Sequence, residues 1–186
     1  SPEVGNTRLM TGQKKNNAMA LTRGSSANYF RNFIFGVEDS LVSTVGLLSG
    51  VAIADVERST IILSGVVLIF VEAISMAAGS FLSESTAREF SGQKEQSLRP
   101  SMTSGAIMFC SYFLAGFIPL SPYLVFSTAT AFPASIGASL FALCCLGVVS
   151  ARLSKTGIAR NVLRMVVVGG LAIAVGVIVG RIVAGA

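Results

Sequence analysis

Residues 33–54 read FIFGVEDSLVSTVGLLSGVAIA, an apolar run of 22 residues that contains two acids, Glu38 and Asp39. A helix needs about 20 apolar residues to cross the hydrocarbon core of a bilayer. A second apolar run, residues 60–82, carries Glu72 near its middle. A carboxylate inside a membrane span costs roughly 2.5–3.5 kcal/mol on insertion scales. Such acids usually face a bundle interior or a water-filled path, although Glu38, near the end of its run, could instead reach the membrane surface.

The composition of the whole chain predicts a polytopic membrane protein. Of its 186 residues, 52% are apolar and 12% are charged, about half the charged share of an average soluble domain. The expected fold class is all-α, with five transmembrane helices over residues 33–54, 60–82, 104–123, 127–151 and 163–184. Two links between these runs are so short that the flanking helices must form antiparallel hairpins. Pro119 and Pro122 predict that the third helix ends there in a compact turn.

The basic residues predict the orientation of an integral membrane protein. Twelve of the 14 Lys and Arg residues lie before the first run, between the second and third, or between the fourth and fifth, counting Arg164 at the start of the fifth run. Cytoplasmic segments carry such an excess, so the N-terminus is expected in the cytoplasm and the C-terminus in a lumen or outside the cell. Because the net charge of +5 follows this topology, it does not indicate a nucleic-acid partner. Which membrane holds the protein stays open.

Two polar segments flank or interrupt the apolar runs. Residues 1–30 are basic and rich in Asn, Ser and Gly, which predicts a disordered cytoplasmic arm before a membrane domain of residues 31–186. Residues 83–103 mix acids with bases and predict a solvated connector with one or two helical turns. Glu84 lies in this connector, so we expect its replacement to change little.

The acids of the first two runs lie on patterned helix faces. In the first run, residues at spacings of three and four share one face: Asp39, Ser43, Gly46 and Gly50. In the second run, Glu72 and Met76 share a face. Counted from the predicted helix ends, Asp39 and Met76 lie at one depth, about 9 Å from the cytoplasmic surface, with Glu72 about one turn deeper. Carboxylate oxygens bind divalent metals, and a thioether adds a preference for softer transition ions. These three residues therefore form a candidate metal site.

Small residues predict close contacts between helices. Gly46 and Gly50 form one small-xxx-small pair, and Gly176 and Gly180 form another. We expect these faces to support a homodimer, because one protomer has few polar groups with which to line an ion path.

Three segments together resemble the vacuolar iron transporter family. They are residues 35–39 (FGVED) followed by Ser43, residues 75–79 (SMAAG) and residues 116–123 (GFIPLSPY). The resemblance implies a homodimer of five-helix protomers that moves Fe²⁺ or Mn²⁺ out of the cytoplasm in exchange for protons, with the path between the two first spans. It implies Asp39 and Met76 as metal ligands and, less directly, Glu72.

The chain departs from that family's pattern at three places. Ser40 and Ser80 stand where the family often has Gly and Glu. The connector of residues 83–103 is short where many members carry a long acidic helical domain. The resemblance therefore leaves open how metal is captured from the cytoplasm and which metal is preferred.

Other function classes fit the sequence less well. An intramembrane enzyme would need paired aspartates or a histidine, and the chain has no histidine, so no catalytic activity and no cofactor are expected. A non-transporting membrane subunit would explain the glycines but not the acids. Transport of an organic cation, and the choice between an antiporter and a channel, stay open.

Overall fold

The computed structural model describes residues 3–90 and 98–185, with side chains from residue 26 onward within these ranges. The described residues form five helices: α1 (Glu3–Ile53), α2 (Arg58–Phe90), α3 (Arg99–Val125), α4 (Thr128–Ser154) and α5 (Ile158–Ala184). By length and composition each contains a segment able to cross a membrane, beginning at Ser26 in the case of α1. The fold is all-α and the protein is an integral membrane protein, as the sequence predicted.

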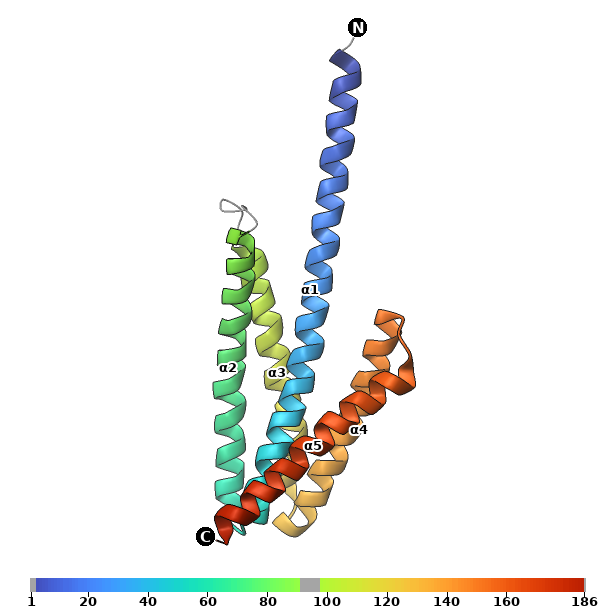
Figure 1. The fold of residues 1–186 in the computed structure, drawn as a ribbon. Coiled ribbons are helices and arrows are strands. Elements are labelled where there is room, and N and C mark those ends of the chain that lie inside the picture. The colour runs from blue at the N-terminus through green and yellow to red at the C-terminus, as the bar shows by residue number, and fades with distance from the viewer. Residues whose placement is uncertain (1–2, 91–97, 186) are drawn as a thin grey trace.

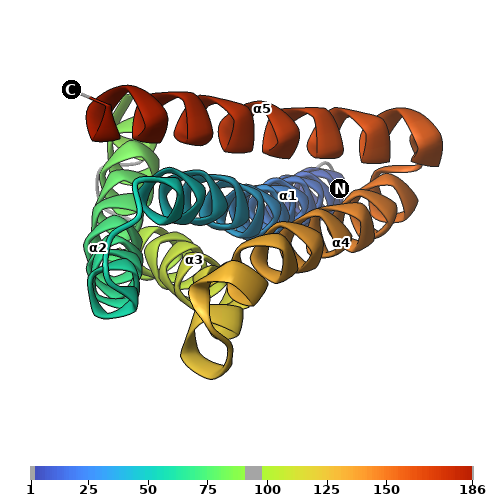
Figure 2. The same cartoon turned by 90° about the horizontal axis from the view of Figure 1, so that it is seen from below.

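The helices surround α1. Seen from below, α1 lies between α5 on one side and α3 on the other, with α2 and α4 at the flanks (Figure 2). It contacts all four of the other helices, while α2 packs mainly on α3 and α4 packs on α5. The two acids of the first span therefore sit on the central helix, where neighbouring helices can reach them.

The first half of α1 extends beyond the other helices (Figure 1). Its backbone is helical from Glu3, whereas the sequence predicted a disordered arm over residues 1–30. A helix without packing partners depends on intrinsic propensity, and Asn, Gly and Ser are weak helix formers. Disorder of the arm in solution therefore stays a prediction.

The connector between α2 and α3 is shorter than predicted. α2 continues eight residues past Leu82, to Phe90, and α3 begins at Arg99. Two helical turns of the predicted connector thus belong to α2, and residues 91–97 lie outside the described part. An ion pair of 3.0 Å between Glu84 and Arg88, one turn apart, supports this extension.

α3 passes through both of its prolines, so the predicted helix end at Pro119 and Pro122 is wrong. The helix continues to Val125. Pro122 has no N–H to donate to the Ile118 carbonyl, and the Ser121 hydroxyl donates to that carbonyl instead, at 2.9 Å. Side chains often satisfy carbonyls freed by proline in membrane helices, which is why such helices tolerate it.

The predicted small-residue faces pack against each other within one chain. A Cβ atom on Gly50 would lie 2.7 Å from the Gly176 carbonyl oxygen, and one on Gly176 would collide with the carbonyl of Gly46. A Cβ on Gly180 would likewise collide with the Gly50 carbonyl. These glycines let α1 and α5 approach closely inside the protomer. They therefore give no support to a homodimer, contrary to the prediction.

Candidate metal site

Two hydrogen bonds define the register between α1 and α2. The Asn28 amide donates to Glu84 at 3.3 Å, and the Asn32 amide donates to Ser80 at 2.9 Å. A step of four residues along α1 thus matches a step of four residues back along α2. Continued by one turn, this register places Gly36 beside Met76, and the next turn places Ser40 beside Glu72.

This register corrects the predicted depths. Asp39 lies level with Glu72, and Met76 lies about one helical turn nearer the end where α2 meets α3, called here the α2–α3 end. The prediction placed Asp39 level with Met76 because it counted from Leu82 as the end of the second helix. Since α2 continues to Phe90, that count was shifted by about one turn.

Asp39 and Glu72 form the acidic centre of the site. Both side chains are half-buried, and the two carboxylates interact electrostatically. Among the described residues, the one ion pair within 4.0 Å joins Glu84 and Arg88, so no Lys or Arg neutralises either acid there. Two uncompensated carboxylates inside membrane spans provide a negative site that a cation can occupy.

A hydroxyl pair beside the acids was missed in the sequence. Tyr112 of α3 is fully buried, and its phenol oxygen lies 2.7 Å from the Ser43 hydroxyl. The Ser40 hydroxyl donates to the Tyr112 carbonyl at 2.6 Å. The phenol interacts electrostatically with Asp39 and Glu72. A tyrosine in mid-membrane must find a polar partner, and that requirement is the signal that could have identified it.

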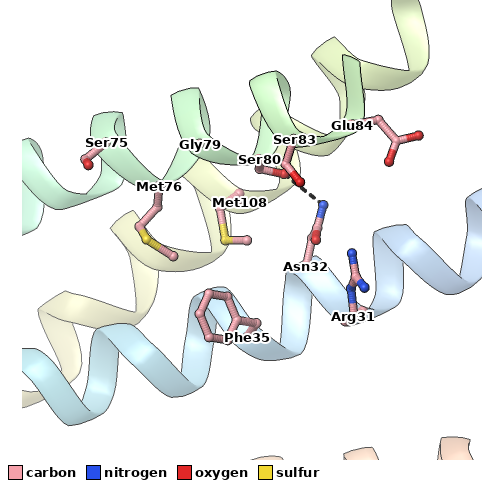
Figure 3. Close-up of a pocket in the computed structure, with 10 residues that line it drawn as sticks. All are labelled: Arg31, Asn32, Phe35, Ser75, Met76, Gly79, Ser80, Ser83, Glu84 and Met108. Carbon is pink, nitrogen blue, oxygen red and sulfur yellow. Dashed lines mark hydrogen bonds between the residues drawn. The ribbon is translucent and has the colours of Figure 1, made fainter. Parts of the chain in front are cut away.

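A cavity of about 540 Å³ lies between α1, α2 and α3 on the α2–α3 side of the acids. Its lining includes the candidate ligand Met76, together with Asn32, Phe35 and Ser80. It also includes Met108 of α3, which the sequence analysis did not select. Both methionine side chains extend into the same space beside the Phe35 ring (Figure 3).

Glu84 also lines this cavity, so its predicted place in a solvated connector is wrong. Its side chain is 15% exposed and pairs with Arg88. It accepts a hydrogen bond from Asn28 of α1. Since α2 continues past Leu82, Glu84 is held on the cavity face two turns from Met76.

The neighbouring acid Glu38 points elsewhere. It lines a separate cavity of about 330 Å³ together with Ser150 and Ser154 of α4. It also interacts electrostatically with Arg164 of α5. Successive residues on a helix project about 100° apart, which explains why Glu38 and Asp39 face different neighbours.

One chain brings few charged metal ligands together. Within residues 26–90 and 98–185, no three His, Cys, Asp or Glu side chains gather closely enough to hold a metal ion. Beyond Ser43, the same face of α1 joins α5 in an apolar groove of about 730 Å³. The polar part of the site therefore spans Glu84 to Ser43 and lies toward the α2–α3 end.

Comparison with known proteins identifies the family. A family model described as the VIT family matches residues 30–100 and 91–181. The chain belongs to the VIT family. Vacuolar iron transporter homolog 1 of Oryza sativa subsp. japonica is 33% identical over 165 residues, covering 80% of this chain and 71% of the relative. Vacuolar iron transporter homolog 4 of Arabidopsis thaliana is 27% identical over 186 residues, covering 93% of each chain.

The structure gives physical reasons for the segments that carried the VIT resemblance. A Cβ atom on Gly36 would collide with the Ser111 hydroxyl of α3. A Cβ on Gly116 would lie 2.6 Å from Ile69 of α2 and 3.0 Å from the Ser40 hydroxyl. These glycines let α3 pack against α1 and α2, next to the part of α1 that carries Asp39.

Proposed function

We propose that this VIT family member transports a divalent transition metal, Fe²⁺ or Mn²⁺, across the membrane. The observation that carries the proposal is the pair Asp39 and Glu72, level with each other in two membrane spans and without a basic partner among the described residues. The two relatives described above carry the name vacuolar iron transporter homolog, which favours Fe²⁺. A passive membrane subunit would not need two such acids in its spans.

The direction of transport follows from the basic residues. We infer that the α2–α3 end faces the cytoplasm, because 12 of the 14 Lys and Arg residues lie in the N-terminal part of α1 up to Arg31, around the α2–α3 connection or around the α4–α5 link. The cavity lined by Met76 and Glu84 lies toward that end. Metal would therefore enter from the cytoplasm, pass the thioethers and reach Asp39 and Glu72 one turn deeper.

Proton exchange is consistent with the same ligands. Carboxylates bind a metal in their deprotonated form, so metal binding releases any protons that they carry. Protons that return to Asp39 and Glu72 from the opposite side would displace the metal there. This cycle needs no group beyond the two acids.

A second copy of the chain would complete the ligand set. One protomer supplies two acids at the deep level, and transition metals bound by oxygen ligands commonly take more. We propose a homodimer in which the acid-bearing faces of the two α1 helices meet, so that symmetry doubles Asp39, Glu72 and Met76. A monomeric mass by light scattering of the protein in mild detergent would contradict this proposal.

The transport proposal can be tested with purified protein in liposomes. We expect Fe²⁺ and Mn²⁺ to enter without any other protein, and Asp39→Asn to abolish entry while the variant remains folded. Asp55→Asn provides a matched control, because Asp55 lies in the exposed turn after α1 and Asn tolerates its positive φ of 56°. Native rates from Asp39→Asn would exclude the acid site, and absence of transport by the unmodified protein would exclude the function.

A further inference from the structure

We propose that Met108 is a second thioether ligand, which acts with Met76 to select softer ions before they reach the acids. This inference deepens the proposed metal transport and rests on it. Met108 lies on α3, 32 residues after Met76 in the sequence, and no helical or strand spacing relates the two residues. The fold nevertheless brings both side chains to one cavity.

The first support is the position of the two side chains. Both methionines line the cavity of about 540 Å³, and both extend toward the same space beside Phe35 (Figure 3). They come from different helices, Met76 from α2 and Met108 from α3. Two sulfur ligands on separate helices can bind one ion from two sides, which a single methionine cannot do.

The second support is the way in which the surroundings hold the Met108 sulfur. Met108 is only 4% exposed. A Cβ atom on Gly36 would lie 3.2 Å from its sulfur, so the glycine leaves the space that this thioether occupies. The Met108 sulfur is therefore fixed against α1 at the cavity wall, next to the level of Met76 in the α1–α2 register.

The third support is the open space in front of the sulfurs. Gly79 lines the same cavity, and a Cβ atom placed on it would meet no atom within 4 Å in the described structure. Its lack of a side chain thus has no packing role against described residues. The absence of a side chain at Gly79 leaves the cavity open on the α2 side, about one turn from Met76, so that an ion can approach the thioethers.

Thioether sulfur discriminates between divalent ions that carboxylates do not distinguish. Carboxylate, carbonyl and water oxygens suit Mg²⁺, Ca²⁺ and Mn²⁺, whereas methionine sulfur favours softer ions. A station with two thioethers, passed before the two acids, would raise the preference for Fe²⁺ over Mn²⁺. It would also make transport sensitive to Cd²⁺, a soft divalent ion.

The experiment uses Cd²⁺ as a soft competitor of Mn²⁺ uptake in liposomes that contain the full-length protein. Met108→Leu keeps the size and apolar character of the side chain and removes the sulfur. We expect it to raise the ratio of the half-inhibitory Cd²⁺ concentration to the half-saturating Mn²⁺ concentration by about threefold or more. Met76→Leu should act in the same direction.

The control is Met102→Leu, which alters an exposed methionine on the same helix, 62% accessible and absent from the cavity lining. It should leave Cd²⁺ inhibition unchanged. Native Cd²⁺ sensitivity in folded Met108→Leu would overturn the inference, while transport by the unmodified protein would still support the proposed function. If Met108→Leu proved unstable, native Cd²⁺ sensitivity of Met76→Leu would overturn the proposal that the two thioethers bind the ion.

Discussion

The phenol oxygen of Tyr112 on α3 lies 2.7 Å from the hydroxyl of Ser43 on α1, beside the acids Asp39 and Glu72. This contact ties the third helix to the helix that carries Asp39. It also leaves Tyr112 without exposed surface, so the phenol has no access to bulk water in the protomer. The pair therefore orients polar groups next to the proposed ion path.

We expect Tyr112→Phe to slow metal transport by about three- to tenfold, because a buried hydrogen bond is worth about 0.5–1.5 kcal/mol. Ser43→Ala should have a similar effect, and the double variant should be no slower than either single one. Tyr123→Phe is the control, since the buried Tyr123 hydroxyl has no hydrogen-bond partner among the described residues. Additive losses in liposome uptake would show that the two hydroxyls act separately.

Glu72→Gln should uncouple transport from protons. The glutamine keeps the shape of the side chain but cannot carry an exchangeable proton. In liposomes with an acidic lumen, the pH gradient should accelerate Mn²⁺ entry through the native protein and accelerate it much less through the variant. An equal response of both proteins would remove Glu72 from the proton path.

Glu84→Gln should weaken the capture of metal at the cavity. Glu84 is the one acid among the residues that line the 540 Å³ cavity, which Arg31 also lines, and its loss leaves the entrance and the neighbouring Arg88 more positive. We expect the half-saturating Mn²⁺ concentration to rise by about three- to tenfold at low salt, with a smaller effect at high salt. Glu89→Gln alters an exposed acid of the same helix and should behave as the native protein does.

Gly176→Ala should lower the melting temperature, because the added Cβ would collide with the Gly46 backbone and force α5 away from α1. Gly170→Ala is a matched control on the same helix. A Cβ atom at Gly170 meets no described atom within 4 Å, and alanine has the higher helix propensity by about 1 kcal/mol. Equal stability of the two variants in a detergent melting assay would contradict the close approach of α1 and α5.

Five spans with a cytoplasmic N-terminus require that the C-terminus lies on the opposite side. A reporter that is active only in the cytoplasm, fused after Ala186, should therefore remain inactive. The same reporter placed in the α4–α5 link, beside Lys155, should be active. A cytoplasmic signal from the C-terminal fusion would contradict the orientation and the proposed direction of transport.

The sequence was sufficient to predict the helices, because five long apolar runs and their charged flanks leave few alternatives. It also selected Asp39 and Glu72, since acids in such runs are rare. Their relative depth was wrong because the predicted end of the second helix, Leu82, reflected composition, whereas the helix continues as a charged extension to Phe90. The relative depth of two residues on paired helices depends on how the helices are aligned. That alignment depends on contacts between the helices, which the sequence of one helix does not reveal.

The partners of individual residues were harder to predict. A small-xxx-small pattern shows that some helix can approach closely, but it does not say which one, and Gly46 and Gly50 meet α5 of the same chain. Met108 and Tyr112 lie in an apolar run where methionine and aromatic residues are ordinary. Only the packing of α3 against α1 shows that they face the site.

The contact between α1 and α5 joins the first and the last of the five described spans. Until Ile158–Ala184 has entered the bilayer, the glycine face of α1 has no helix to receive it, although Asp39 and Glu38 are already inside the membrane. The close contact between α1 and α5 can therefore form only after α5 has been synthesised and inserted. Until then, the Gly46 and Gly50 face of α1 stays open to lipid.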